Sequence, residues 1–217
     1  MTRLGVNLLW IRPGRVGGTE DFMVRLLRGL LEVEHEFDVT AYAQPGFVSA
    51  HPELSGLRFV TTPFDTDSRI ARVGLEHSWL AWRTRRDRMD VVHHGGGTVP
   101  AVGTSPRVVT IHDLQWRDYP QYVPPSKLRY LRFATPRTLA RAAVVTTVSE
   151  FVKRTVVDAY DIDARRIVVT HHGMEADLGR SGTPEAELRM KYGLGDRPVV
   201  VYPAMTYPHK RHDFLVD

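Results

Sequence analysis

The chain has 217 residues, 42% of them hydrophobic and 25% charged, and a net charge of +4 at pH 7. This is the composition of a globular protein with enough apolar residues for one complete core and part of another. It excludes a membrane-spanning protein, since no apolar run approaches ~20 residues, and a disulfide or thiolate metal framework, since cysteine is absent.

The charge and the first residues limit partners and location. A positive excess favours anionic partners such as nucleotide phosphates and lipid headgroups. It is spread along the chain without a nucleic-acid-binding motif, so we expect no nucleic acid partner. The first ten residues lack the apolar region of a signal peptide, and Arg12 and Arg15 follow them. We therefore expect cytoplasmic localisation.

The chain begins with a strand, a glycine-containing turn and a helix. Residues 4–10 are a predicted strand, and Thr19 is a predicted helix N-cap, with Glu20 and Asp21 at the positive end of the helix dipole. The apolar spacing continues to about Glu34, where we expect the helix to end. This order is the first unit of a Rossmann-like sheet.

Gly17 and Gly18 raise the question of phosphate binding. They do not form the three-glycine fingerprint of dinucleotide-binding proteins, and Glu20 competes with a phosphate for the helix N-terminus. The carboxylate suits the hydroxyl groups of a sugar equally well. Two interpretations remain, a substrate-binding turn and a tight turn without a ligand.

Residues 68–89 are predicted to form one amphipathic helix. Its polar face holds Arg72, Glu76, Arg83 and Asp87, and its opposite side holds Ile70, Val73, Trp79, Leu80 and Trp82. Its last turns contain Arg83, Arg85, Arg86 and Arg88. Aromatic and basic residues together are typical of a membrane-surface helix. The alternative is a core-packed helix with a solvated basic end.

A strand at residues 90–94 ends in His93 and His94 and continues into three glycines at 95–97. Such a run permits a close approach of the backbone or a mobile loop. Other histidines, at 112, 171 and 172, also follow strands. Because the spacing of a metal-ligand motif is missing, we expect no metal site.

The central strand, residues 108–111, consists only of β-branched residues, as is typical in the middle of a parallel sheet. It ends at His112 and Asp113. Ligands of open α/β sheets bind outside the carboxyl ends of the strands, and histidine exchanges a proton near neutral pH. His112 is therefore a candidate catalytic residue. The alternative is that His112 only caps the strand and that Asp113 starts the next turn.

The other elements complete an alternating pattern. Strands are predicted at residues 37–43, 57–61, 143–148 and 167–170, a helix at 126–141, and a second helix after Ser149, its N-cap. Residues 44–55 and 116–125 are predicted turns and loops. Seven strands that alternate with helices predict an α/β fold with a Rossmann-like, doubly wound, mainly parallel sheet.

After residue 180 the pattern changes. Residues 181–197 are predicted to form a linker and a short helix, and residues 198–217 a strand and the start of a helix. A single strand with one or two helical turns cannot bury its own apolar face. We therefore expect one domain at residues 1–180 and the first part of a truncated second domain at 198–217.

Five short motifs lie in the order found in one family. They are Gly17-Gly18-Thr19-Glu20, Thr110-Ile111-His112-Asp113-Leu114, Thr147-Val148-Ser149-Glu150-Phe151, His171-His172-Gly173, and Tyr202-Pro203-Ala204 with Pro208-His209-Lys210. Together they resemble the retaining, two-domain glycosyltransferases called family 4 or group 1. The resemblance implies a GT-B architecture, in which the first domain mainly holds the acceptor and the second mainly binds a nucleotide-sugar. It implies transfer of a hexose, with retention, to a glycan or polyprenyl-linked acceptor, without a metal or other cofactor.

The resemblance also implies roles for single residues. His112 would hydrogen-bond the reacting sugar or assist charge development, and Lys210 would meet the donor diphosphate. The substrate-binding positions would be Gly17, Gly18, Thr19, Glu20, Asp113, Ser149 and Gly173. Because many relatives act on lipid-linked acceptors, we also expect peripheral contact with an anionic membrane, at its inner face, through the helix at 68–89.

Two departures from the family pattern affect these expectations. The family often has an arginine several residues before the lysine, where this chain has Ala204-Met205-Thr206, which leaves His209 or Arg211 as alternatives. The family's E-x7-E element is missing from this sequence, so we expect the 217-residue chain alone to be inactive. A non-catalytic module that binds a sugar or nucleotide is the alternative function. An epimerase or reductase would need three spaced glycines after the first strand, which residues 14–18 do not supply.

Overall fold

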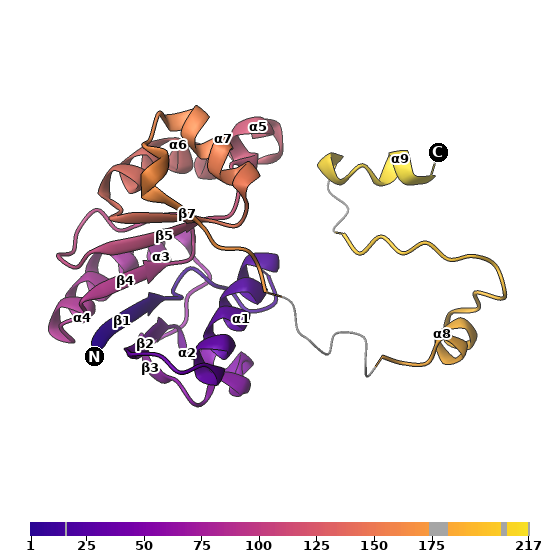
Figure 1. The fold of residues 1–217 in the computed structure, drawn as a ribbon, viewed down its shortest axis with the longest axis horizontal. Coiled ribbons are helices and arrows are strands. Elements are labelled where there is room, and N and C mark those ends of the chain that lie inside the picture. Colours follow the sequence, from indigo (N-terminus) through magenta and orange to yellow (C-terminus); the bar gives the residue numbers. More distant parts are fainter. Residues whose placement is uncertain (16, 174–181, 205–207, 217) are drawn as a thin grey trace. The chain divides into compact units, whose positions relative to one another are not determined.

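The computed structural model of the chain describes residues 1–15, 17–173, 182–204 and 208–216 (Figure 1). The chain divides into two units, Met1–Gly173 and Met174–Asp217, and each is described by itself. Among the described residues, the buried apolar core lies entirely in the first unit. The expected domain boundary at residue 180 lies outside the described residues.

A seven-stranded sheet forms the first unit. Its strands are β1 (Thr2–Asn7), β2 (Phe37–Ala43), β3 (Arg58–Thr61), β4 (Val91–His94), β5 (Arg107–Ile111), β6 (Val144–Thr147) and β7 (Ile167–Val169). Every neighbouring pair is parallel, in the order β3-β2-β1-β4-β5-β6-β7. The predicted Rossmann-like, doubly wound α/β fold is confirmed.

The chain changes direction through the sheet between β1 and β4. From β1 it moves outward through β2 to β3, returns to β4 on the other side of β1, and continues outward to β7. The loops after β1 and β4 therefore leave the sheet toward opposite edges. In open α/β sheets this is the position, outside the carboxyl ends of the strands, at which ligands bind.

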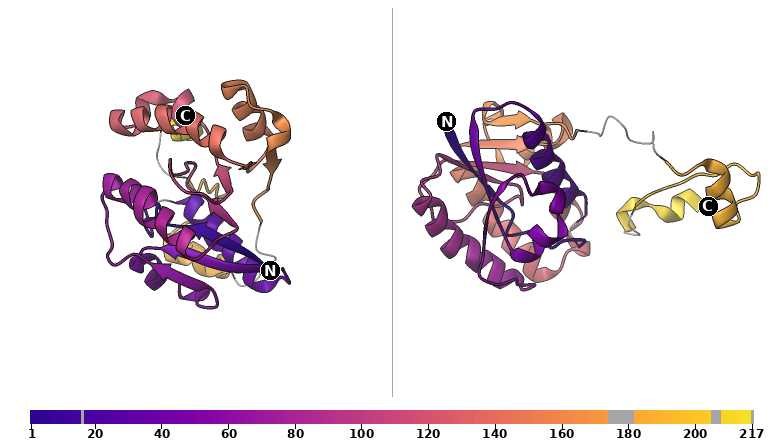
Figure 2. Two further views of the ribbon diagram at one scale, coloured as in Figure 1. Left: turned by 90° about the vertical axis from the view of Figure 1, so that its left-hand side faces the viewer. Right: turned by 90° about the horizontal axis from the view of Figure 1, so that it is seen from below.

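Helices cover both faces of the sheet (Figure 2). They are α1 (Gly18–Glu32), α2 (Pro45–Ala50), α3 (Arg69–Leu75), α4 (Ala81–Arg86), α5 (Gln115–Asp118), α6 (Pro125–Arg141) and α7 (Glu150–Tyr160). Side chains alternate between the faces along each strand. Ala41 of β2 thus packs with Met23 of α1, whereas its neighbour Tyr42 packs with Leu80 on the other face.

The helical segment opposite α1 is wound differently from the predicted regular helix. A π-helical turn, Glu76–Leu80, separates α3 from α4. Ile70 and Trp82, predicted on the buried side, are 87% and 52% exposed, and Glu76, predicted on the polar face, is buried. A π-turn holds more residues than an α-turn, so it changes which side chains face the sheet. The prediction is therefore wrong for Ile70, Trp82 and Glu76, whereas Leu80 is buried and Trp79 packs against the core, as the predicted faces required.

A second apolar cluster supports β5 and β6. Val109 and Val145 of these strands are fully buried and pack with Leu139 of α6 and Val156 of α7. β7 closes the cluster through Ile167. Because β5 has strands on both sides and apolar neighbours, its carboxyl end is held rigidly in the middle of the sheet.

The second unit contains only helical elements in residues 182–204 and 208–216: α8 (Glu185–Tyr192), α9 (His212–Val216) and a 3-10 turn, Pro208–Lys210. The predicted strand at residues 198–202 is wrong. A strand without a neighbouring strand leaves its backbone N–H and C=O groups unpaired, and Val200 and Val201 are 80% and 76% exposed. None of the described helices combines the length and apolar character needed to cross a membrane.

Three local predictions were also wrong. Residues 44–55, predicted as turns, contain α2 and the 3-10 turn Pro52–Leu54, whose Phe47 and Leu54 are buried. Residues 116–125, predicted as a loop, overlap α5 and the 3-10 turn Pro120–Tyr122. Thr19 is not the N-cap of α1, because Gly17 has that position and its carbonyl accepts the N–H of Glu20 (2.8 Å).

Because the described core belongs to the first unit, we predict that residues 1–173 fold alone. Their thermal unfolding midpoint, measured by circular dichroism, should lie within about 3 °C of that of the 217-residue chain. A fragment of residues 1–166, which lacks β7 and the buried Ile167, is the control and should be clearly less stable. A much lower midpoint for residues 1–173 would show that the second unit contributes to the core.

Candidate functional site

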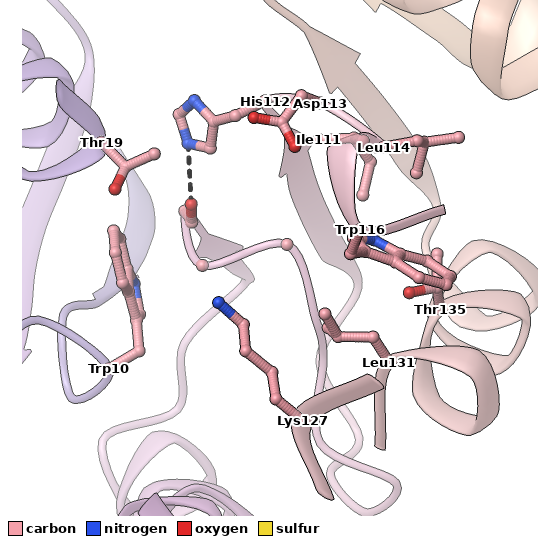
Figure 3. Close-up of a pocket in the computed structure, with 13 residues that line it drawn as sticks. Trp10, Thr19, Ile111, His112, Asp113, Leu114, Trp116, Lys127, Leu131 and Thr135 are labelled. Carbon is pink, nitrogen blue, oxygen red and sulfur yellow. Dashed lines mark hydrogen bonds between the residues drawn. The ribbon is translucent and has the colours of Figure 1, made fainter. Parts of the chain in front are cut away.

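A cavity of about 300 Å³ lies at the carboxyl end of β5. It is next to β1 and β4, between which the chain changes its direction through the sheet. Figure 3 shows Trp10 and Thr19 on one side, Trp116, Leu131 and Thr135 on the other, and His112 with Asp113 at the end of the strand. The loop of three glycines, 95–97, completes the lining. Apolar walls with a few polar groups are typical of a small-molecule site.

His112 is fixed by a hydrogen bond to the main chain. Its Nε2 lies 3.0 Å from the carbonyl oxygen of Gly95, and because a carbonyl can only accept, Nε2 carries the proton. Burial lowers the pKa of His112, and the charge of His172 lowers it further, against the hydrogen bond to Gly95 and the charge of Asp113. His112 is therefore neutral at pH 7, and Nδ1 has no hydrogen-bond partner among the described residues.

Aromatic rings surround the other side of His112. Phe22 of α1 meets His112 edge to face, with ring centroids 5.1 Å apart, and stacks on His172 at 4.7 Å. The chain after β7 runs back across the carboxyl ends of the strands toward α1 (Figure 1). It thereby brings the predicted His171-His172-Gly173 motif to the end of β5, two strands away in the sheet.

The glycine loop after β4 is a close-packed support. A Cβ atom on Gly95 would collide with Sδ of Met23, and a Cβ atom on Gly96 would lie 2.6 Å from the ring of Trp10. Gly97 has a φ of 78°, which side chains rarely adopt. Of the two expectations for these glycines, close approach is confirmed. It places the Gly95 carbonyl at His112.

The turn before α1 provides one lining residue. Thr19 lines the cavity, whereas Gly17 and Gly18 are exposed and a Cβ atom on either would meet nothing within 4 Å. Gly17 has a φ of 73° and therefore needs to be glycine for the turn itself. Space in front of both glycines remains open to a ligand, and their binding role stays a prediction.

Glu20 is buried and bonded within the protein. Its carboxylate accepts the N–H of Gly14 (3.1 Å) and lies 3.0 Å from Nε2 of His51. His51 in turn lies 3.0 Å from Glu53. These contacts hold the loop between β1 and α1, and Glu20 is not among the residues that line the cavity. Its predicted contact with substrate stays untested.

The other predicted residues lie in different places. Asp113 lines the cavity, and its carboxylate accepts the N–H of Gln115 (3.0 Å). Ser149 caps α7 by accepting the N–H of Val152 (3.2 Å), as predicted, and is outside the cavity lining. Gly173 ends the first unit. Lys210 is exposed in the second unit, and Met205 and Thr206 lie outside the described residues.

A buried polar network beside the cavity was missed in the sequence. The amide of Asn7, at the end of β1, donates to Oε1 of Glu76 (2.8 Å) and to Nδ1 of His94 (3.2 Å). Burial raises the pKa of Glu76 to about 7 and lowers the pKa of His94 to about 3. Two strand ends and the π-turn are thus joined through Asn7. No sequence signal distinguishes Glu76 from Arg72, because a regular helical period places both on one polar face.

His93 is also engaged inside the sheet. Its Nε2 lies 2.8 Å from the hydroxyl of Thr110, which lies 2.8 Å from the hydroxyl of Thr146. Burial lowers the pKa of His93 to about 4. The described residues contain no group of three or more histidine, aspartate or glutamate side chains that could hold a metal ion.

The chain is similar to known proteins over most of its length. The family model of Glycosyltransferase Family 4 matches residues 16–178. The O-antigen chain mannosyltransferase B of Escherichia coli is 28% identical over 131 residues, which are 60% of this chain and 34% of that protein.

Solved structures share the fold. Anabaena Alr3699/HepE, in complex with UDP and glucose, matches with a TM-score of 0.65 and 16% identity over 100% of this chain and 56% of that one. A UDP-GlcNAc 2-epimerase from Neisseria meningitidis, bound to UDP-GlcNAc, matches with a TM-score of 0.54 and 13% identity over 79% and 47%. The chain thus spans about half the length of these structures, and the fold alone does not separate a transferase from an epimerase.

The raised pKa of Glu76 makes a testable contribution to stability. The ordinary pKa of a glutamate is 4.5, and burial raises that of Glu76 to about 7. Between these two pH values the folded protein holds a proton that the unfolded chain releases. Stability from this group therefore falls as pH rises through that window. Glu76→Gln keeps an acceptor for Asn7 but never ionises. Its stability relative to wild type should increase by roughly 1–3 kcal/mol between pH 4.5 and 7.

Denaturant unfolding at several pH values measures this difference. His93 and His94, whose pKa values are lowered, act in the opposite direction in both proteins and so cancel in the comparison. Glu32→Gln, an exposed change at the end of α1, is the matched control and should follow the wild-type profile. If the difference in unfolding free energy between Glu76→Gln and wild type did not change with pH, the raised pKa of Glu76 would be contradicted.

Proposed function

The chain belongs to Glycosyltransferase Family 4, and we propose that it supplies the acceptor-side domain of a GT-B enzyme. In this proposal the enzyme transfers a hexose from a nucleotide-sugar to a glycan or polyprenyl-linked acceptor and retains the anomeric configuration. The likeness to an O-antigen chain mannosyltransferase supports a hexose donor and a polysaccharide product. The ammonium group of Lys210 would bind the donor diphosphate as a point charge.

The observation that carries the proposal is the neutral His112 at the end of β5. With its Nε2 proton committed to Gly95, the ring presents Nδ1 as an acceptor for a sugar hydroxyl group. The walls of the same cavity contain Trp10 and Trp116, whose rings suit the apolar faces of a sugar. A neutral histidine in the lining of a cavity with aromatic walls favours a polyhydroxylated ligand.

We further propose that transfer needs a complete donor domain. Residues 182–204 and 208–216 contain no strand, and most of their apolar side chains are exposed. A nucleotide-sugar site on a second Rossmann-like domain needs a sheet whose loops can bind the nucleotide. The 217-residue chain alone would then bind an acceptor without turning over.

The test joins residues 1–217 to the complete donor domain of an active family member. With labelled nucleotide-hexoses and polyprenyl-linked glycans, we expect transfer by the joined enzyme and none by the chain alone. His112→Ala should lower kcat by roughly 100-fold, because a group acting in the transition state is lost. Its unfolding midpoint should change little.

His35→Ala is the matched control, since His35 precedes β2 and so lies at the opposite end of the parallel strands. It should keep the parent kcat. A His112→Ala enzyme with unchanged kcat would leave His112 as a strand cap. If the joined enzyme bound sugars but transferred none, a non-catalytic binding module would be the better description.

We also propose peripheral contact with an anionic membrane through α4. Trp82 is 52% exposed, and the guanidinium of Arg86 lies 5.3 Å from the centre of its ring. Arg85 and Arg88 are exposed nearby, whereas Arg83 is paired with Asp87 at 2.9 Å. Trp79 packs against the core cluster around Tyr42, so Trp82 is the tryptophan available to an interface.

Co-sedimentation with anionic vesicles tests this contact. Each basic residue contributes on the order of 1 kcal/mol near such a surface, so Arg85→Gln/Arg86→Gln/Arg88→Gln should weaken binding by about 10-fold or more at low salt. Arg129→Gln/Arg132→Gln/Arg137→Gln removes the same charge from exposed positions of α6 and is the control. Equal loss in both variants, or no binding by wild type, would contradict the proposal.

A further inference from the structure

A second cavity, of about 170 Å³, adjoins the site at His112. The two cavities share Trp10, Gly96, Lys127 and Leu131 in their walls. The second one extends toward α3 and the π-turn, where Arg69, Arg72 and Glu76 line it. Lys127, at the start of α6, therefore faces both spaces, and Figure 3 shows its Nζ pointing into the first toward Trp10.

Three cationic side chains converge on this small space without carboxylate partners. Neither Arg69 nor Lys127 forms an ion pair with any of the described residues. Arg72 donates to the main-chain carbonyls of Asp67 (2.9 Å) and Thr66 (3.4 Å), not to a carboxylate. The one acid in the wall, Glu76, is bonded to Asn7 instead.

The cations act on one another. Desolvation lowers the pKa of Lys127, and the charge of Arg69 lowers it further, although Asp113 opposes this. Desolvation likewise lowers the pKa of Arg72, followed by the charges of Arg12 and Arg69, although the charges of Asp67 and Glu76 oppose this. Like charges held together at a partly desolvated cavity repel, and a bound anion would relieve that repulsion. Guanidinium and ammonium groups are the donors that phosphate oxygens prefer.

We infer that the second cavity is a subsite for a phosphate group carried by the acceptor. Bound there, the phosphate would place the rest of the acceptor in the adjoining space, with Lys127 at the junction and a hydroxyl group near His112. The assignment of this phosphate to the acceptor rests on the proposed function. The anion site itself needs neither a donor nor a transfer reaction.

Calorimetric titration of the 217-residue chain with inorganic pyrophosphate tests the subsite. We expect saturable binding by wild type and a Kd about 10-fold or more higher for Arg69→Gln/Lys127→Gln, since charge-assisted hydrogen bonds are lost. Arg72 is kept because its bonds to the main chain support the loop before α3. Arg69→Gln alone, at an exposed position without a partner among the described residues, should give a smaller increase and an intact fold.

Arg85→Gln/Arg86→Gln is the matched control. It removes the same charge from exposed positions of α4 outside the cavity lining and should leave the Kd within about 2-fold. Equal weakening in both double variants would show general attraction to a basic protein and overturn the subsite, as would no binding by wild type. If wild type binds pyrophosphate but the joined enzyme transfers no hexose, only the proposed function is refuted.

The source of the phosphate is separated by two further probes. One is a short-chain, water-soluble prenyl diphosphate, and the other is a glycosyl 1-phosphate. If either compound competes with pyrophosphate for wild type but not for Arg69→Gln/Lys127→Gln, the result supports the subsite. Tighter binding of the prenyl compound would indicate a lipid-linked acceptor, and tighter binding of the glycosyl phosphate a soluble one. If neither competes, the subsite is not used by a phosphorylated acceptor and the inference fails.

Discussion

The hydrogen bond from Nε2 of His112 to the carbonyl of Gly95 is the constraint on which the candidate site depends. It exists because the loop after β4 can pack directly against Met23 of α1 and against Trp10, which side chains at 95 and 96 would prevent. The bond settles the tautomer of His112, and burial keeps the ring neutral. This bond joins the loop after β4 to the end of β5, and it leaves Nδ1 without a hydrogen-bond partner among the described residues.

The electrostatics of the first unit divide into a neutral interior and a cationic wall. His93, His94 and His112 all have lowered pKa values, and the buried Glu76 has a raised one, so low polarity disfavours charge near the strand ends. The cations Arg69, Arg72 and Lys127 lie next to this region around the second cavity. A neutral, aromatic pocket suits a sugar, and the adjoining cations suit a phosphate. The two spaces together are the basis of the proposal that the acceptor carries a phosphate group.

Sequence patterns predicted the sheet and the position of His112 because both depend on local order. Uniformly β-branched residues indicated β5, and a parallel strand fixes where its carboxyl end lies. The role of Glu76 could not be predicted, since a regular helical period places it with Arg72 on a polar face, and only the π-turn and Asn7, 69 positions away, make it a buried group. The strand expected at residues 198–202 failed for a related reason: a strand needs partners that sequence periodicity alone cannot supply.

The most direct test of this account is the protonation state of His112 itself. Nitrogen-15 NMR of the labelled chain, with His112→Gln for assignment, reports both the tautomer and the pKa of the ring. We predict the Nε2–H tautomer and a pKa below the ordinary 6.5. An Nδ1–H tautomer, or a pKa above 6.5, would contradict the bond to Gly95 and with it the arrangement of the site.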